Sequence, residues 1–496
     1  MITKEKKFKT FKSDWVLVLL CLSVYCIGFF IYYPEVVVSR DATDYLLQAK
    51  NFSEGVVWAT DTSPLTGSHS QWATNYPVGT SLLLTPFYYL GGLKASFLFP
   101  LLSLVLLVLI TAKWISENGR SPIFSLLVLG FPATLVLGRV PLSDIPAGVL
   151  VALTCWFFWR GAKGSKAFSF LAGLLWVLIS VVREPGTFLL IPLFLGSFFR
   201  KDRNLRYTVF GAAIGLILKF SLDKIVWNVF FHNTTRGEFG IEFFLTNTAF
   251  YSMVFLFLFP AGLIAFIIYR GARWPELLIG GAAYFILFSL FEHLAYYDFL
   301  KSLVNGPRYF ISFTPILAFQ MAEVYPLLRR KIERKINFLN PDKVFSFIKY
   351  CWIIGVLLVS LCVHIFMGQF EKKGTTIKNT IYSVTGDRSI IVTEQSSTST
   401  YINRLYGNRH LLDINTIRKY SEQRGISTSE VMGELIDRYK DVYIVILERF
   451  ESEFWLERNK DSRNFLTTIQ SMVKPIIDVN IDSNRKLLIY NVYDHE

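Results

Sequence analysis

Side chains that could take part in chemistry gather in five short polar segments of this sequence. The first reads SRDATDYLLQAKNFSEG, and it places two carboxylates, Asp41 and Asp44, just after a long apolar run. Asp41, Tyr45 and Ala49 recur at intervals of four residues, so a helix would carry all three on one face. Carboxylates can exchange protons with a ligand or bind its hydroxyl groups. Asp41 is therefore the first candidate for a functional residue.

The other four segments contain arginines as well as acids. They read GRVPLSDIPAG, VVREPG, the stretch after Leu222, and FEHLAYYDFLKSLVNGPRYF, and each borders an apolar run. Charged groups at a membrane boundary are costly unless they face a cavity or pair with one another. The candidate site residues are Asp41, Asp44, Tyr45, Asp144, Arg183, Glu184, His232, Arg236, Glu292, His293, Asp298, Arg308 and Tyr309.

Purely structural roles are open for several of these residues. Asp144 could cap a helix that begins near Pro146, and Arg183 could form a local ion pair with Glu184. Arg308 could anchor the chain among lipid headgroups. No metal site and no cofactor are predicted, because the six histidines are scattered and the five cysteines lie in or beside apolar runs.

The elements that must position these residues are predicted to be transmembrane helices. Of the 496 residues, 52% are hydrophobic and only 18% are charged, whereas soluble domains average about 25% charged residues. A spanning helix needs about 20 mostly apolar residues. We predict about 11 such helices, in the ranges 15–33, 95–112, 123–138, 146–159, 167–182, 187–199, 207–222, 247–269, 277–291, 309–325 and 350–369.

The basic residues indicate the orientation of these helices. Gaps on the side of the N-terminal tail hold 22 Lys and Arg in about 55 residues, whereas the opposite gaps hold 10 in about 117. Cytoplasmic loops carry such an excess, so we predict the N-terminus inside and the C-terminus outside the cytoplasm. The net charge of +13 is assigned to contacts with membrane lipids, and no nucleic acid partner is predicted.

The predicted fold is a polytopic α-helical membrane protein with a small extracytoplasmic α/β domain. A cytoplasmic tail (1–14) precedes a transmembrane domain (15–369) whose first external loop, 34–94, contains a short apolar run predicted as an interfacial or re-entrant helix. The α/β domain (370–496) contains strand-like runs at 389–393, 442–447, 476–481 and 487–492. Ser427 and Glu430 have the spacing of a capping box at a helix start.

The order of these motifs resembles that of the GT-C membrane glycosyltransferases. The most similar branch contains the protein O-mannosyltransferases and the lipid A aminoarabinose transferase. DATDYLLQA is similar to the Asp-Glu-x-x-Tyr stretch in the first external loop of that family, and YPVG to its Tyr-Pro-Pro-Gly-type segment. SDIPAG, Arg183 and GPRYF follow in matching order, so the resemblance covers roughly residues 15–325. Ala42 stands where the family often has a second acid, and Asp44 is the residue that could compensate.

The resemblance implies a transferase that takes a sugar from a polyprenyl-phosphate carrier to a hydroxyl group of a lipid, glycan or protein acceptor. By family position Asp41 would be the general base. Arg308, and after it Arg183, would stabilise the phosphate leaving group, because a planar guanidinium binds phosphate oxygens in bidentate fashion. Asp144 would bind hydroxyl groups or order the site. Direct displacement with inversion is expected, and a metal is not needed for a phosphate monoester leaving group.

Other functions stay open at this point. A transporter or lipid flippase would also have many spans and intramembrane charges, but it would place them near the bilayer midplane and often show internal repeats. An oligosaccharide ligase that uses a pyrophosphate carrier, and a non-catalytic membrane scaffold, are further alternatives. The predicted location is the plasma or inner membrane, with the active site on the extracytoplasmic side.

Overall fold

The structure is a computed structural model that describes residues 2–232, 238–292, 306–335, 341–393, 400–449, 474–482 and 485–492. Its internal contacts divide the chain into two compact units, which are described separately. The first unit consists of Met1–Tyr33, Asn75–Leu90 and Ala95–Met367, and the second of Pro34–Thr74, Gly91–Lys94 and Gly368–Glu496. Three predicted site residues, Arg236, His293 and Asp298, lie outside the described residues.

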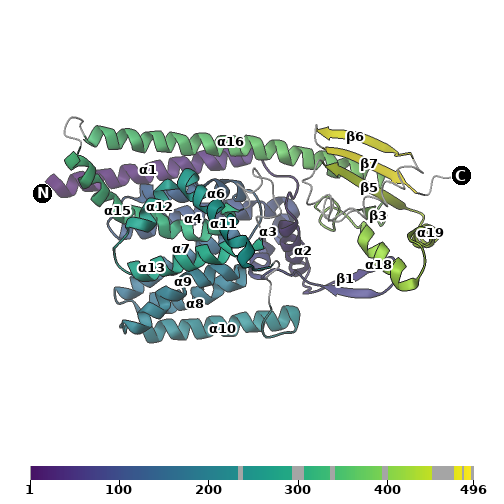
Figure 1. Cartoon of the computed structure of the whole chain (residues 1–496), viewed down its shortest axis with the longest axis horizontal. Helices are drawn as coiled ribbons and strands as arrows, with labels where there is room; N and C mark the ends of the chain where they lie inside the picture. Colours follow the sequence, from purple (N-terminus) through teal and green to yellow (C-terminus); the bar gives the residue numbers. More distant parts are fainter. Residues whose placement is uncertain are drawn as a thin grey trace. The chain divides into compact units, whose positions relative to one another are not determined.

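The first unit is helical in nearly all of its described residues (Figure 1). Its longer helices are α1 (Ile2–Ile31), α3 (Gly79–Ser96), α4 (Leu98–Glu117), α7 (Asp144–Ala162), α8 (Lys166–Val182), α9 (Glu184–Phe199), α10 (Leu205–Trp227), α11 (Phe244–Met253), α12 (Pro260–Ile268), α13 (Trp274–Ser289), α15 (Thr314–Lys335) and the start of α16 (Pro341–Val384). Shorter pieces are η1 (Pro122–Ser125), α5 (Leu126–Leu129), α6 (Pro132–Leu137), η2 (Ile241–Phe243), the π-helix η3 (Val254–Leu258) and η5 (Pro307–Phe313).

Among the described residues, six helical stretches are long and apolar enough to cross a membrane by length and composition. They are Lys12–Ile31, Leu98–Glu117, Asp144–Ala162, Ile241–Leu258, Pro307–Ile332 and Lys343–Val384, and α8, α9 and α13 are shorter apolar helices. The chain is therefore a multi-pass membrane protein, as predicted. The count of 11 spans and the orientation of the helices stay predictions.

Two of the predicted spans are not continuous helices. The range 123–138 is divided among η1, α5 and α6, and the range 247–269 among α11, η3 and α12. One junction in each range falls at a Phe-Pro pair: Phe131 is extended (ψ 115°) before Pro132, and Phe259 leaves the helical region (φ −141°) before Pro260. The proline ring disfavours a helical conformation of the preceding residue, which explains both interruptions.

Helices α8 and α10 run side by side because glycines remove side chains from their interface (Figure 1). A Cβ atom at Gly173 of α8 would collide with the backbone carbonyl oxygen of Thr208, and one at Gly211 of α10 with that of Phe170. Gly215 follows Gly211 by four residues, and its own Cβ would meet Val177 at 2.8 Å. This spacing of small residues allows two membrane helices to approach closely.

We expect the substitution Gly211→Ala to destabilise the protein by about 1–3 kcal/mol, because the new methyl group must push the two helix backbones apart. Gly355→Ala in α16 is the matched control, since a Cβ atom there would meet nothing within 4 Å. Thermal unfolding of the detergent-solubilised protein should show a lower midpoint for Gly211→Ala only. Equal midpoints for the two variants would contradict this packing.

The second unit contains a five-stranded sheet and a separate β-hairpin. The sheet has the strand order β4-β3-β5-β7-β6, in which β3 is parallel to β4 and β5, and β7 is antiparallel to β5 and β6. Its strands are β3 (Ile390–Thr393), β4 (His410–Asp413), β5 (Val442–Arg449), β6 (Ile477–Asp482) and β7 (Arg485–Asn491). The four strand-like runs of the sequence overlap β3, β5, β6 and β7, whereas the four-residue β4 was not predicted.

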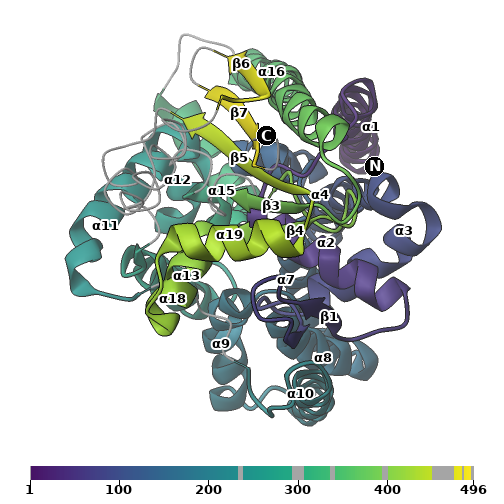
Figure 2. The same ribbon diagram turned by 90° about the vertical axis from the view of Figure 1, so that its right-hand side faces the viewer.

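Both faces of the sheet are buried at strands β3, β5 and β7, whereas Asp478, Val479 and Asn480 of the edge strand β6 are exposed. Helices α18 (Ile414–Arg424) and α19 (Thr428–Arg438) pack on the face formed by Val392, Ile444 and Leu488 (Figure 2). The last turns of α16 contribute Ile377 and Ile381 to the opposite face. Strands covered on both sides are rich in continuous apolar residues. The capping box predicted at Ser427 and Glu430 is present at the start of α19.

The rest of the second unit comes from the loop 34–94, which the sequence predicts to be external. It contains helix α2 (Arg40–Ser53) and a hairpin of β1 (Ala59–Thr62) and β2 (His69–Trp72). These elements pack with the sheet domain, so the loop has its packing partners in the C-terminal part of the chain. The short apolar run that follows in the sequence forms α3, whose helical conformation is interrupted at Gly91 and Gly92.

Candidate functional site

A buried ion pair joins the ends of three helices in the first unit. Arg183 is the single extended residue (φ −161°, ψ 105°) between α8 and α9, and Asp144 lies in the first turn of α7. Arg183 Nη2 lies 3.1 Å from Asp144 Oδ1, and Arg183 Nη1 donates to Ser143 Oγ at 3.0 Å. The two charged side chains are only 14% and 2% exposed. The structure therefore gives Arg183 a partner on another helix, Asp144, whereas the sequence suggested only a local ion pair with Glu184.

The charge of Arg183 is maintained by this arrangement. Burial of the guanidinium acts against its charged form, but the adjacent Asp144 carboxylate, together with smaller contributions from Tyr284 and Tyr309, keeps the pKa of Arg183 above its ordinary value. Arg183 Nε is buried and has no hydrogen-bond partner among the described residues. A buried charge without a partner would be strongly destabilising, so Asp144 is required for Arg183 to be present here as a cation.

Tyr309 connects this ion pair to a second arginine. The guanidinium carbon of Arg183 lies 5.1 Å from the centre of the Tyr309 ring, and that of Arg308 lies 5.2 Å from it. Arg308 Nη2 also donates to the Tyr309 hydroxyl at 3.4 Å. The hydroxyl group of Tyr284 donates to the Tyr309 carbonyl oxygen at 2.7 Å, and Phe288 stacks on the Tyr309 ring at 4.5 Å. The helical turn η5 that carries Arg308 and Tyr309 is thus fixed to α13.

The resulting cluster of Asp144, Arg183, Arg308 and Tyr309 contains two cations and one anion. Its two guanidinium groups are partly shielded from water, which strengthens their attraction for an anionic ligand. Guanidinium groups suit phosphate in particular, because their planar N–H donors match two phosphate oxygens at once. We call these four residues the arginine cluster. All four were predicted from the sequence as site residues, and the structure brings them together.

Two further members of this neighbourhood were not predicted. Ser143 binds Arg183, and Tyr284 binds the backbone of Tyr309. Tyr284 lies inside an apolar run, where a tyrosine hydroxyl needs a hydrogen-bond partner when it is buried. That requirement was the one signal in the sequence that could have identified it.

Helix α2 of the second unit carries the predicted acids. Asp41 lies in its first turn, where a carboxylate is favoured by the helix dipole, and Thr43 bonds back to the carbonyl oxygen of Ser39 through its amide and its hydroxyl group. Asp41 and Asp44 are both partly exposed and lie three residues apart on one face. The predicted helix through Asp41 and Tyr45 is present as α2, and Tyr45 is buried in it.

Ala42 has an exposed fraction of 0%. A carboxylate at this position would be buried and would need a partner of its own. Asp44 therefore occupies the accessible position on α2 that is nearest to Asp41 on the same face.

His232 belongs to a different cluster of the first unit. Its ring stacks on Trp227 with centres 4.0 Å apart, and its amide donates to Asp223 Oδ2 at 3.3 Å, which also accepts from Lys219 at 2.6 Å. Burial lowers the pKa of His232, so the ring is neutral at pH 7. Helix α10 extends to Trp227, whereas the predicted helix ended at residue 222. Asp223 and Trp227 are therefore helical, and the prediction that they lie in a loop is wrong.

The remaining predicted residues lie at chain junctions. Glu184 begins α9 directly after Arg183. Glu292 accepts a hydrogen bond from the Glu238 amide at 3.2 Å and donates its own amide to the Glu238 carbonyl at 3.0 Å, so it joins two loop segments. In the part of the chain that the structure describes, no group of three or more His, Cys, Asp and Glu side chains is arranged to hold a metal ion.

No protein-family model matches this sequence, and no curated protein matches it either. Solved structures do match. ArnT from Cupriavidus metallidurans in its apo state superimposes with a TM-score of 0.61 at 14% identity, covering 97% of this chain and 98% of that chain. The chain has the ArnT fold. The ArnT structure bound to undecaprenyl phosphate gives a TM-score of 0.59 at 12% identity over the same shares.

A second protein with a similar fold is the Archaeoglobus fulgidus oligosaccharyltransferase tethered to an acceptor peptide. Its TM-score is 0.53 at 12% identity, with 88% of this chain and 69% of that chain covered. The resemblance to GT-C glycosyltransferases, drawn from short motifs, is thereby confirmed at the level of the fold.

The Asp144–Arg183 pair leads to a stability prediction. Asp144→Leu leaves the arginine buried without its anion and should cost about 3–5 kcal/mol, whereas Asp144→Leu/Arg183→Met removes both charges and should recover most of that loss. Thermal unfolding in detergent compares the two variants with wild type. If the double variant were no more stable than the single one, the loss of stability in Asp144→Leu would not come from the unpaired charge of Arg183.

Proposed function

We propose that this protein is a membrane glycosyltransferase that moves a sugar from a polyprenyl-phosphate carrier to an acceptor hydroxyl group. The observation that supports this most directly is the arginine cluster, a phosphate-compatible site in a chain with the fold of ArnT. One ArnT structure is bound to undecaprenyl phosphate, a lipid that a donor of this class would release. The lipid tail of such a donor stays in the bilayer, which suits a site at the ends of apolar helices.

The proposed role of the arginine cluster is to stabilise the leaving group. When the glycosidic bond breaks, negative charge develops on the carrier phosphate, and preorganised cations lower the energy of that state. Arg308 is the first choice for direct contact with the phosphate. Arg183 is the second, because Asp144 already neutralises part of its charge at 3.1 Å. Asp144 orders this arrangement or binds a hydroxyl group.

The proposed general base is Asp41. It would accept the proton of the acceptor hydroxyl as the oxygen attacks the anomeric carbon. With a single base and no second nucleophile assigned, the reaction is a direct displacement with inversion at that carbon. Asp44, on the same face of α2, is proposed to bind substrate hydroxyl groups.

The reaction is proposed to take place on the non-cytoplasmic face of the cell membrane. The excess of Lys and Arg on the side of the N-terminal tail supports this orientation, because short cytoplasmic loops carry such an excess. The acceptor is a lipid, glycan or protein.

An oligosaccharide ligase is the second candidate, and the similarity to the archaeal oligosaccharyltransferase favours it. Such an enzyme would transfer a whole glycan from its lipid carrier. The two candidates differ in whether one sugar or a preassembled chain reaches the acceptor.

The central test follows release of free polyprenyl phosphate from a panel of polyprenyl-phosphate sugars, with membrane extract as the acceptor source. We expect wild type to release it only with extract and Asp41→Asn to lose at least about 100-fold in rate, since general base catalysis contributes that much. Asp44→Asn serves as the matched variant on the same helix face and should retain more activity. The configuration of the product, determined by NMR, should be inverted.

Full activity of Asp41→Asn would remove Asp41 from the role of base, and a retained configuration would exclude direct displacement. Turnover of oligosaccharide pyrophosphate carriers alone would favour the ligase. Movement of a solute or lipid in proteoliposomes, without turnover of any donor, would replace the transferase by a transporter.

A further inference from the structure

The first external loop is anchored to the C-terminal α/β domain from both sides of the domain's sheet. Val36, before α2, is buried in the cluster on one face together with Ile377 and Ile391. Leu65, at the tip of the β1–β2 hairpin, is 5% exposed and belongs to the cluster on the other face, with Val392 and Leu435. A single stretch of 30 residues thus contributes apolar side chains to both cores of the domain, Val36 and the partly buried Val38 to one and Leu65 to the other.

Polar contacts hold the segment between these two anchors. The Val37 amide donates to the Tyr406 hydroxyl at 2.7 Å, directly before α2. At the other end of α2, Lys50 Nζ donates to the Arg404 carbonyl oxygen at 2.9 Å, and Arg404 Nη2 donates to the Thr60 carbonyl oxygen at 3.1 Å. Both ends of α2 are therefore bound by residues of the α/β domain.

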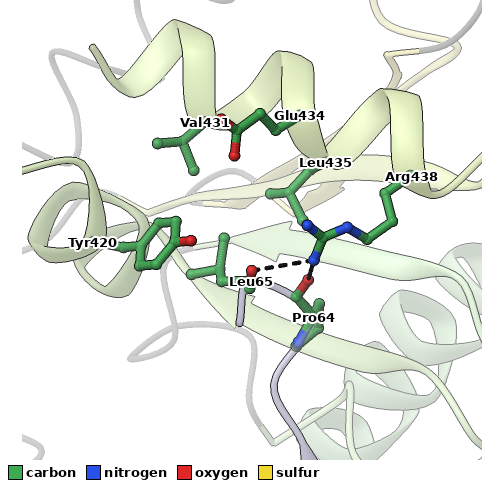
Figure 3. A pocket seen from close by; sticks show the side chains of 7 residues that line it. All are labelled: Pro64, Leu65, Tyr420, Val431, Glu434, Leu435 and Arg438. Carbon is green, nitrogen blue, oxygen red and sulfur yellow. Dashed lines mark hydrogen bonds between the residues drawn. The ribbon is translucent and has the colours of Figure 1, made fainter. Parts of the chain in front are cut away.

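The hairpin tip is held by Arg438 of α19. Its Nη1 atom donates to the carbonyl oxygens of Pro64 and Leu65 at 3.3 and 3.2 Å, and Figure 3 shows the Leu65 side chain between Tyr420 and Leu435. Backbone carbonyls that would otherwise lose their hydrogen bonds on burial are satisfied here by a cation.

Gln48 links α2 to the hairpin through hydrogen bonds within the loop. The side chain is completely buried, donates to the Val57 carbonyl oxygen at 2.8 Å and accepts from the Thr74 amide at 2.9 Å. It therefore connects α2 to the chain on either side of the hairpin. A loop of this length has a high conformational entropy, and its order has to come from contacts outside itself.

We infer that the C-terminal α/β domain is a positioning element for α2, and that Leu65 and Arg438 are positioning residues for Asp41. The anchors at Val36 and Leu65 fix the two ends of the segment, while Tyr406 and Arg404 fix the two ends of the helix. The effect on catalysis rests on the proposed function, whereas the ordering of α2 does not.

Hydrogen–deuterium exchange of the full-length protein in detergent tests the ordering. In Leu65→Ala and Arg438→Ala, exchange of the α2 amides should rise by about tenfold or more, the change that 1.4 kcal/mol of lost local stability produces. Exchange of β5 and α7 should stay as in wild type, which shows that both units remain folded. Arg424→Ala is the control, because Arg424 pairs with Glu434 at 2.5 Å across the same two helices without contacting the loop.

Turnover under the assay described above tests the positioning role. Both variants should lower kcat with little change in the KM for the donor, as expected when a group acts mainly in the transition state, and Arg438→Lys should restore part of the loss. Unchanged α2 exchange in both variants would overturn the inference. Faster exchange with unchanged kcat would overturn the positioning role. If α2 exchanges faster in both variants but the wild-type protein has no transferase activity, the ordering of α2 by the domain is supported. The proposed function is then rejected.

Discussion

The arginine cluster depends on one buried ion pair. Arg183 stands at the break between α8 and α9, and Asp144 stands at the start of α7, so a single contact of 3.1 Å unites three helix ends. Without the carboxylate, a guanidinium that is 14% exposed would carry an uncompensated charge. With it, the guanidinium can lie against Tyr309, which also contacts Arg308. The position of the Arg183 guanidinium beside Tyr309 and Arg308 therefore depends on this pair.

The two units are ordered by different kinds of contact. In the first, glycines such as Gly173 and Gly211 allow apolar helices to pack closely, and a rigid scaffold then determines where the charged helix ends lie. In the second, a long loop with little core of its own is ordered by a domain from the far end of the sequence, through Leu65 and Arg438. The arginine cluster thus obtains its precision from helix packing, and α2 obtains its order from a folded domain.

The sequence predicted helices and candidate site residues, which depend on local patterns, but it did not predict contacts between residues that are distant in the sequence. Helices α4, α7, α8 and α13 were predicted to within a few residues, because uncharged runs are directly visible. The predictions failed at Phe131 and Phe259, where the following proline ends a helix inside an apolar run. Asp144, Arg183, Arg308 and Tyr309 were identified from their positions at the ends of such runs. The contacts of Arg183 within this set, and the contact of Leu65 with α19, could not be predicted, because the partners are far apart in the sequence.

The central claim is that the arginine cluster binds the phosphate of a lipid carrier. Its most direct test is the affinity of the purified protein for undecaprenyl phosphate, measured by native mass spectrometry in detergent. Because a hydrogen bond to a charged group contributes about 1.5–3 kcal/mol, Arg308→Gln should weaken binding by at least about tenfold, and Arg308→Lys by less. Arg424→Gln, a change at an exposed ion pair of the second unit, should leave it unchanged. Equal affinities of wild type and Arg308→Gln would contradict the claim.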